Sequence, residues 1–207
     1  MDWCEWREAY DDPASGLARR LQVVRELIGA ELDRRPAPVA VISLCAGAGD
    51  DLIGPLAARP AHRGTRALLV ELDPIMAGHA RDAARAAGLD EVVVRRADAA
   101  RSDAYAGWAP AGLVLLCGVL GNVTDDDAER TVRAMRQLVL EHGAVIWTRH
   151  RRAPDLTPRI RGWFADAGFA EEAFVSPGPG EFSVGMHRLG CPPEPLERGA
   201  AWFTFTR

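Results

Sequence analysis

The sequence predicts an α/β fold, in which a mostly parallel, seven-stranded sheet is doubly wound and covered by helices on both faces. Short apolar runs rich in β-branched residues alternate along the chain with stretches of helical spacing. A glycine-rich turn directly follows the first of these runs. Near its end the chain instead carries two strand-like runs in succession, which indicates an antiparallel pair at one edge of the sheet.

The first expected element is an amphipathic lead-in helix. Apolar residues recur at helical spacing over residues 17–32, and Ser15 precedes them as a candidate cap. Residues 39–44 then form an apolar, β-branched run, which is typical of a strand covered on both faces. We expect this run to be the first central strand.

Strands and helices alternate after this point, as they do in βαβ units with right-handed crossovers. The further expected strands are residues 67–70, 91–95, 112–116 and 144–147. The expected helices are residues 51–59, 74–87, 125–141 and 157–168. Residues 182–189 and 200–206, joined by a proline-rich turn, are expected to form the antiparallel pair.

Composition limits the class of protein. A chain of 207 residues with a hydrophobic fraction of 48% suits a single domain with one core. We expect residues 1–35 to form a helical and aromatic cap region and residues 36–207 to form the core. The formal net charge of −4 gives no reason to expect binding to nucleic acid or to a membrane. A small-molecule partner is therefore favoured, for a monomer or a homodimer.

Cysteine spacing and hydropathy suggest a compartment. The four cysteines are scattered without CxxC or CxxH spacing, which predicts neither a metal site nor a disulfide framework. No apolar stretch has the length of a membrane span, and the first residues carry acids instead of the apolar core of a leader peptide. We expect a cytoplasmic protein.

A glycine-rich turn with the sequence Cys45-Ala46-Gly47-Ala48-Gly49 follows the first expected strand and precedes a helix. Glycines there let the backbone approach a ligand, and the free amides at the start of a helix receive polar groups. The turn alone also fits a connection that binds nothing. A nicotinamide cofactor is disfavoured, because Leu52 stands where a dinucleotide fingerprint needs glycine or alanine.

Acids follow the second and third expected strands. Glu71 ends the second strand about 20 residues beyond the glycines, where a carboxylate can accept both ribose hydroxyls of an adenosine cofactor. Asp73, which precedes Pro74, is instead expected to cap the next helix. Asp98 follows the third strand, where it either accepts a hydrogen bond from an adenine amino group or is a solvated loop acid.

Residues 41–51, 69–74, 97–105, 113–127 and 145–152, in this order, resemble class I S-adenosylmethionine-dependent methyltransferases. The likeness is closest to a group of predicted actinobacterial methyltransferases without an assigned substrate. That group has a similar Ser-Leu-Cys-Ala-Gly motif, a Gly-Val-x-Gly-Asn loop and a Trp-Thr-Arg-His-Arg-Arg motif. The resemblance covers nearly the whole chain and implies a Rossmann-like fold, S-adenosyl-L-methionine as the cofactor and methyl transfer as the activity.

The resemblance also implies a cofactor site. By position it assigns Cys45, Ala46, Gly47 and Gly49 to the methionine end, Glu71 to the ribose, Leu72 to one adenine face, Asp98 and Ala99 to the adenine edge, and Cys117 and Gly118 to the sulfonium. Two positions depart from the family pattern. Ser43 stands where the first strand usually carries an acid, and Cys45 replaces the first glycine of the motif.

The methyl acceptor is expected beside residues 118–122 and 148–152, because ligands of open α/β sheets lie outside the carboxyl ends of the strands. His150 is either a candidate base for the acceptor or a structural histidine. Asn122 either orients the acceptor or stabilises a turn. Arg149 is expected to face the acceptor and suits an anionic one.

Other polar and aromatic residues near these loops have less specific interpretations. Arg151 and Arg152 are expected to lie on the surface, with nearby acids such as Asp155 as partners. An N-terminal aromatic group either covers the pocket as a lid or packs on the lead-in helix; it comprises Trp3, Trp6 and Tyr10. Trp147 is expected in the core.

The preferred interpretation is methyl transfer to a small molecule, with S-adenosylhomocysteine as the product. Methylation of a protein or a nucleic acid is a second interpretation, and the acidic balance disfavours nucleic acid. A third is a catalytically silent cofactor-binding or regulatory domain, because the fold does not fix the function. An aminopropyl transferase and a nicotinamide oxidoreductase are the remaining alternatives.

Overall fold

The computed structural model describes residue 12, residues 15–178 and residues 180–206. The described strands form one seven-stranded sheet in the order β3-β2-β1-β4-β5-β7-β6. Strand β7 is antiparallel to both of its neighbours, and the other pairs are parallel. The strands are β1 (Val41–Leu44), β2 (Ala67–Glu71), β3 (Val92–Arg96), β4 (Ala111–Leu116), β5 (Val139–His150), β6 (Phe169–Val175) and β7 (Phe182–Leu189). The predicted mostly parallel sheet is confirmed.

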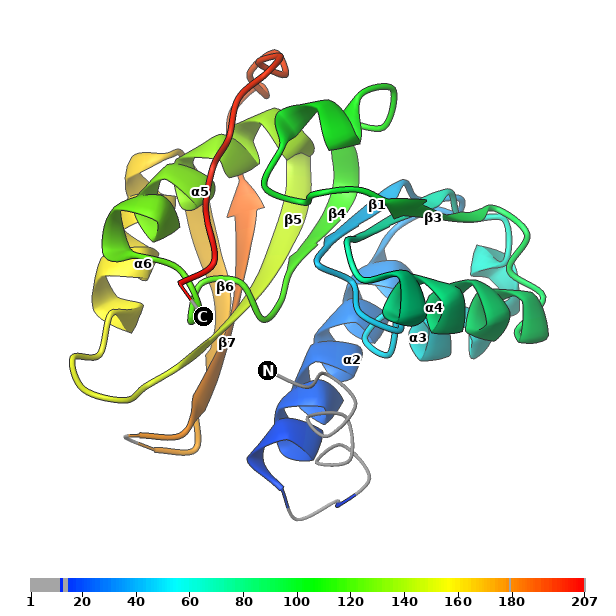
Figure 1. The fold of residues 1–207 in the computed structure, drawn as a ribbon, viewed down its shortest axis with the longest axis horizontal. Coiled ribbons are helices and arrows are strands. Elements are labelled where there is room, and N and C mark those ends of the chain that lie inside the picture. The colour runs from blue at the N-terminus through cyan, green and yellow to red at the C-terminus, as the bar shows by residue number, and fades with distance from the viewer. Residues whose placement is uncertain (1–11, 13–14, 179, 207) are drawn as a thin grey trace.

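Helices cover both faces of this sheet (Figure 1). One face carries α2 (Gly16–Arg34), α3 (Ile53–Ala57) and α4 (Pro74–Ala86). The other carries the 3-10 turn η2 (Ser102–Tyr105), α5 (Asp125–Leu138) and α6 (Thr157–Asp166). Side chains of one strand enter the two cores alternately: Ile42 and Leu44 pack under α5, and Val41 packs under α2. The chain is therefore doubly wound.

Two predicted helix starts are confirmed by their caps. The Ser15 hydroxyl accepts a hydrogen bond from the Ala18 amide at 3.0 Å, at the start of the lead-in helix α2. The Asp73 carboxylate accepts from the amides of Ile75 at 2.8 Å and Met76 at 3.0 Å. Asp73 is thus the cap of α4, as the Asp-Pro pair predicted.

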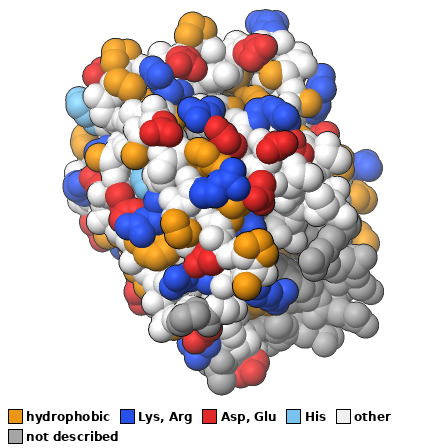
Figure 2. Space-filling view, turned by 90° about the vertical axis from the view of Figure 1, so that its left-hand side faces the viewer, with side chains coloured by type: hydrophobic (Ala, Val, Ile, Leu, Met, Phe, Trp, Pro, Cys, Tyr) orange, Lys and Arg blue, Asp and Glu red, His pale blue; other side chains and the backbone are white. Residues whose placement is uncertain are grey.

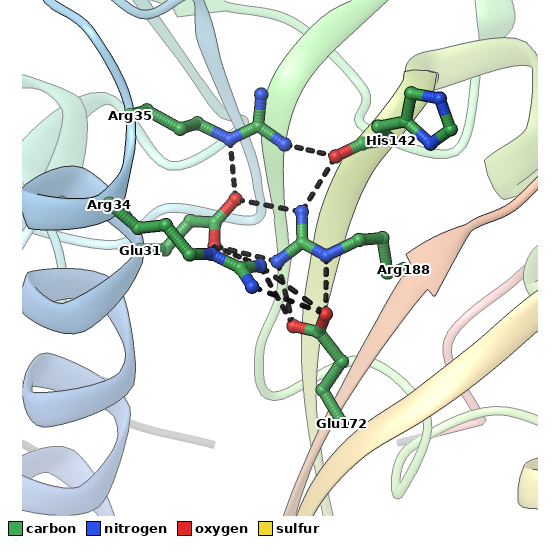
Figure 3. Close-up of polar contacts among 6 residues, drawn as sticks. All are labelled: Glu31, Arg34, Arg35, His142, Glu172 and Arg188. Atoms are coloured by element: carbon green, nitrogen blue, oxygen red, sulfur yellow. Dashed lines mark hydrogen bonds and ion pairs between the residues drawn. The ribbon is translucent and has the colours of Figure 1, made fainter.

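An ion cluster around a buried acid attaches α2 to the sheet at the edge where the parallel strands begin. We call it the basal ion cluster; it comprises Glu31, Arg34, Arg35, His142, Glu172 and Arg188 (Figure 3). The side chain of Glu31 is fully buried and pairs with Arg188 at 2.8 Å and with Arg34 at 3.0 Å. Arg35 and Arg188 also donate to the backbone carbonyl of His142. The cluster therefore joins α2, β5, β6 and β7.

The C-terminal pairing differs from the prediction. The partner of β7 is β6, and residues 200–206 contribute only a single bridge, between Ala201 and Arg101. Strand β6 lies at the edge of the sheet with Glu171 and Glu172 exposed, so its sequence lacks the apolar character of the central strands. Residues 200–206 instead run along α5 (Figure 1), where Trp202 and Phe203 are buried.

Several element boundaries also differ. Helix α3 has five residues instead of the expected 51–59, because Pro60 disfavours a helical conformation at Arg59. Strand β5 is longer than the expected 144–147 and takes the last three residues of the expected helix 125–141. It continues through the polar residues 148–150, because their backbone pairs with β7. Helix α6 ends two residues before the expected 168, and the other shifts are of one or two residues.

Candidate functional site

The order of the strands reverses between β1 and β4, at the centre of the sheet. The chain leaves β1 toward α3 on one face and leaves β4 toward α5 on the other, so the two connections diverge. Ligands of open α/β sheets bind at such a switch point, outside the carboxyl ends of the strands. The turn of residues 45–49 and the loop of residues 118–122 follow β1 and β4 and lie at this switch point.

The two glycines of the turn have different surroundings. Both have positive φ, +55° at Gly47 and +80° at Gly49. A Cβ atom at Gly47 would meet no atom of the described residues within 4 Å. A Cβ atom at Gly49 would lie 2.5 Å from Cδ1 of Ile53 and 3.0 Å from Cδ2 of Leu69. Gly47 therefore faces open space, whereas Gly49 lets α3 pack against β2.

The carboxylate of Glu71 faces this turn. Oε2 accepts a hydrogen bond from the Gly47 amide at 2.8 Å, and Oε1 accepts from the Asp73 amide at 2.9 Å. An ionised carboxylate has about four acceptor positions, so roughly two remain for other donors. The neighbouring side chains of Leu72 and Ile75 are 60% and 58% exposed. The Glu71 carboxylate, which has acceptor positions left, thus lies beside the exposed apolar side chains of Leu72 and Ile75.

The segment after β3 lies next to Glu71, because β2 and β3 pair up to Glu71 and Arg96. Asp98 is exposed, and its Oδ1 accepts from the Ala100 amide at 2.9 Å. Ala99 is buried, and its carbonyl accepts from the Tyr105 hydroxyl at 2.6 Å. The structure therefore brings the Asp98 carboxylate to the surface of the site but turns the Ala99 side chain into the core.

Two residues near the end of β4 had no individual role in the sequence analysis. The Gly118 amide donates to the hydroxyl of Thr148 on β5 at 2.9 Å. Burial raises the pKa of the Cys117 thiol and of the nearby Asp51 carboxylate. Asp51 directly follows the glycine turn, but the pattern there was interpreted only as the start of a helix. No pattern in the residues next to Thr148 indicates its contact with Gly118.

The loop of residues 118–122 is held by one of its own side chains and by a side chain of β5. The side-chain amide of Asn122 donates to the Gly118 carbonyl at 2.7 Å, so Asn122 stabilises the turn. Arg149 donates to the Leu120 carbonyl, and its Nε is buried without a partner among the described residues. Burial lowers the pKa of Arg149, and it stays a cation at neutral pH.

His150 lies against the same loop. A Cβ atom at Gly121 would be 3.1 Å from Cδ2 of His150. Its Nδ1 accepts a hydrogen bond from the Arg152 amide at 3.3 Å, which leaves Nε2 as the protonated nitrogen of the neutral ring. Arg149 and His150 are therefore both beside residues 118–122, and their role toward an acceptor stays a prediction.

Arg151, Arg159 and Arg161 of this region are paired with acids, whereas the exposed Arg152 forms no ion pair among the described residues. Arg151 binds Asp155 at 2.8 Å, in agreement with the prediction of a surface ion pair. On α6, Arg159 pairs with Asp125 and Arg161 pairs with Glu171. The side of the molecule that carries α6 accordingly shows interspersed positive and negative side chains (Figure 2). The arginine-rich sequence does not form a basic patch on this side.

Residues 200–206 form what we call the carboxyl-terminal strap. The Trp202 ring stacks on Tyr105 with ring centroids 5.4 Å apart. The Thr204 amide donates to the Asp127 carboxylate at 3.0 Å. The amide and hydroxyl of Thr206 donate to the Asn122 carbonyl at 2.9 Å and 3.1 Å. The strap thus connects the segment after β3 with the loop after β4.

Some predicted features lie outside these observations. The aromatic group of Trp3, Trp6 and Tyr10 lies outside the described residues. Trp147 is fully buried in the core, as expected. In the described part of the chain, no group of three or more histidines, cysteines and acids could hold a metal ion. No helix there is long and apolar enough to cross a membrane.

Comparison with known proteins identifies the fold. No family model and no curated protein matches the chain. Among solved structures, it is similar to magnesium protoporphyrin IX methyltransferase from Synechocystis with bound S-adenosylmethionine: the TM-score is 0.69 at 16% identity, over 91% of each chain. The chain has the Rossmann-like methyltransferase fold.

Two further methyltransferases, both from Burkholderia thailandensis, have a similar structure. The 1,6-didemethyltoxoflavin-N1-methyltransferase, with its substrate and S-adenosylhomocysteine bound, gives a TM-score of 0.67 at 17% identity over 90% of this chain and 83% of that enzyme. An O-methyltransferase family protein gives 0.64 at 21% identity over 83% of this chain. The chain spans 55% of the length of that O-methyltransferase family protein. At these identities the likeness concerns the fold.

Proposed function

We propose that this chain transfers the methyl group of S-adenosylmethionine to a small-molecule acceptor and releases S-adenosylhomocysteine. The observation that carries the proposal is the pairing of Glu71 with Gly47 at the switch point of a methyltransferase fold. This pairing places a carboxylate with spare acceptor positions beside open space. The same proposal includes a finer likeness to actinobacterial methyltransferases. It also includes a single domain, a monomeric or homodimeric state and a cytoplasmic location.

The residues of the site fit an adenosine-containing cofactor. Glu71 has roughly two acceptor positions left, which matches the two hydroxyl donors of a ribose. The exposed side chain of Leu72 follows it and offers an apolar face to a purine ring. Asp98 adds a carboxylate at the end of the neighbouring strand, where it can accept from an amino group. The set contains no cation that would select a phosphate.

When bound, the cofactor supplies a methyl group on a positively charged sulfur. Methyl transfer requires in-line approach of a nucleophile, and orientation alone can contribute about 7–11 kcal/mol in favourable cases. The contacts of Asn122, Thr148 and Arg149 hold the loop after β4 in one shape and so provide a rigid wall for the acceptor. His150 lies beside this loop, on the acceptor side of the proposed site, where it would contact an acceptor.

The acceptor is proposed to be a small molecule. Two of the structurally similar enzymes act, by their names, on magnesium protoporphyrin IX and on 1,6-didemethyltoxoflavin. The half-buried cation of Arg149, whose Nε has no partner among the described residues, favours an acceptor that carries an anionic group. Arg151, Arg159 and Arg161 are instead paired with acids.

Titration calorimetry with S-adenosylhomocysteine tests the cofactor assignment. Glu71→Gln keeps the size of the side chain but replaces one acceptor oxygen by a donor, and we expect an affinity loss of roughly 10- to 100-fold. Glu91→Gln makes the same chemical change at an exposed site before β3, and it should bind as the wild type does. Equal affinities of the Glu71→Gln variant and the wild type, or tight binding of NAD by the wild type, would contradict the assignment.

Labelled S-adenosylmethionine tests the activity. Incubation with fractionated cell extracts should transfer label to a small molecule and produce S-adenosylhomocysteine. Binding without transfer in every extract would instead support the silent, cofactor-binding alternative.

A further inference from the structure

The carboxyl-terminal strap is a part of the chain beyond the sheet that the proposed reaction does not yet use. It starts beside the segment after β3, where the Ser102 amide donates to the Ala200 carbonyl at 3.1 Å. It ends at the loop after β4, where the Thr206 amide donates to the Asn122 carbonyl at 2.9 Å. Figure 1 shows this end of the strap beside the connection from β4 to α5. The strap therefore reaches the loop that is proposed to face the acceptor.

Phe205 lies in the part of the strap that is attached to this loop. The amides of the residues before and after it donate to the Asp127 carboxylate at 3.0 Å and to the Asn122 carbonyl at 2.9 Å. Its ring meets the buried ring of Phe203 edge to face, with the centroids 5.3 Å apart. Both neighbours of Phe205 along the backbone are thus held, and its ring rests on a side chain of the core.

The ring of Phe205 is nevertheless 41% exposed. Among the described residues with large, exposed hydrophobic side chains, it is the aromatic one. Leu72 and Ile75 of the same set lie beside Glu71, on the proposed adenosine side of the site. A ring whose backbone is already fixed loses little freedom when it binds a ligand, and aromatic rings favour stacked or edge-to-face contacts with other rings. Phe205 is accordingly suited to hold a flat apolar group.

A cation contacts the same loop. Arg149 donates to the Leu120 carbonyl, two residues before the Asn122 carbonyl that binds the strap. Its half-buried guanidinium suits an anionic group. A ligand at this loop would therefore meet a positive charge and an aromatic ring together. An aromatic ring with an acidic substituent satisfies both, whereas an aliphatic acid would leave Phe205 in water.

We propose that the methyl acceptor is an aromatic molecule with an acidic group, and that Phe205 contacts its ring. Phe205 is a specificity-determining residue, and the contacts of Thr206 with Asn122 keep it at the loop. This inference rests on the proposed function and adds to it the substrate class and a residue of the acceptor site that lies outside the sheet.

The labelled product tests the substrate class. The wild type is incubated with labelled S-adenosylmethionine and fractions of cell extract, and the labelled small molecule is purified. It should bind to an anion exchanger and have the ultraviolet absorption of an aromatic ring. A labelled product without aromatic absorption would overturn the inference and leave the proposed function standing. If no fraction yields a labelled product, the proposed function fails and the inference fails with it.

Variants of Phe205 test the contact, with the active fraction as the source of acceptor. Phe205→Ala should raise the KM for the acceptor roughly tenfold with little change in kcat, because a contact made before and during transfer is lost. Phe205→Tyr keeps the ring and should stay within about twofold of the wild type. S-adenosylhomocysteine should bind both variants as it binds the wild type, which calorimetry measures.

Leu140→Ala is the matched control. Leu140 is 40% exposed, like Phe205, but lies near the start of β5, at the opposite edge of the sheet. This variant should keep the wild-type KM, and circular dichroism checks that all three variants are folded. An unchanged KM in Phe205→Ala would overturn the inference. So would an equal loss of S-adenosylhomocysteine affinity, because Phe205 would then act through the fold.

Discussion

At the scale of single residues, the two glycines of the β1 turn show how one motif combines two tasks. From the sequence alone, Gly47 and Gly49 have the same expected role. In the structure, Gly47 borders open space and Gly49 is in contact with Ile53 and Leu69. Packing requires a glycine only at position 49. This requirement cannot be read from the sequence, because it depends on which side chains lie next to the turn in three dimensions.

The two glycines should therefore respond differently to the same substitution. Gly47→Val should lower S-adenosylhomocysteine affinity at least tenfold, because the new side chain enters the open space where the cofactor is proposed to bind, and should lower the free energy of unfolding by about 1–2 kcal/mol through left-handed backbone strain alone. Gly49→Val should lower the free energy of unfolding by about 3 kcal/mol through overpacking and left-handed backbone strain. Thermal melts and calorimetry on both variants measure this. Loss of folding in Gly47→Val with unaffected stability in Gly49→Val would reverse the assignment.

His187 on β7 gives the fold a dependence on pH. Its side chain is 1% exposed, its Nδ1 accepts from the Trp147 indole at 3.1 Å, and burial lowers its pKa to about 4. In the unfolded chain the pKa returns to about 6.5. Between these values the unfolded state binds more protons, so stability is present above pH 6.5 and is lost as the pH falls toward 4. The loss should be about 3 kcal/mol.

Urea unfolding at pH 7 and at pH 4.5 measures this effect. His187→Gln removes the titrating group and keeps an acceptor for the Trp147 indole, so the difference between the two pH values should shrink. The exposed His79 serves as the control, and His79→Gln should keep the wild-type difference. An unchanged pH dependence in His187→Gln would show that other groups cause it.

At the scale of elements, the attachment of α2 depends on the basal ion cluster. Glu31 is fully buried among Arg34, Arg35 and Arg188 (Figure 3). Glu31→Gln leaves these cations without their central anion, and removal of one partner of a buried ion pair costs about 3 kcal/mol. Glu26→Gln, on an exposed turn of the same helix, should change stability by less than about 0.5 kcal/mol. Identical urea midpoints for the two variants would contradict this account.

Elements were predictable where their signals are local. The caps Ser15 and Asp73 and the position of Glu71 at the end of β2 could be predicted, because each depends on neighbours within a few residues or on the end of an apolar run. Strand β6 was missed because an edge strand tolerates exposed acids, so its sequence lacks apolar alternation. Residues 200–206 have the composition of a strand, but no free strand edge lies beside them, and their aromatic rings pack on α5 and η2 instead.

The site residues that sequence reasoning missed depend on longer-range contacts. Thr148 meets Gly118 across 30 residues, and Asp51 lies near Cys117, on the other side of the switch point. Neither contact leaves a pattern in the residues next to it. The position of Asn122 was predicted, but which of its two proposed roles the structure supports became visible only from its contact with Gly118.

At the scale of the whole molecule, the two sides of the switch point are assembled from contacts of different range. The pairing of Gly47 with Glu71 spans 24 residues, and that of Glu71 with Asp73 spans two. The strap joins Thr206 to Asn122 across 84 residues and Ala200 to Ser102 across 98. Closing a longer stretch of chain costs more conformational entropy before any contact compensates for it.

This difference sets an order of folding. The turn after β1 and the carboxylate of Glu71 can come together as soon as β1 and β2 pair, whereas the contact between Asn122 and Thr206 needs the end of the chain. We therefore expect the contacts of Glu71 to form first and those of the strap to form last. A molecule part-way through folding would hold the glycine turn against Glu71 while residues 200–206 are still unattached.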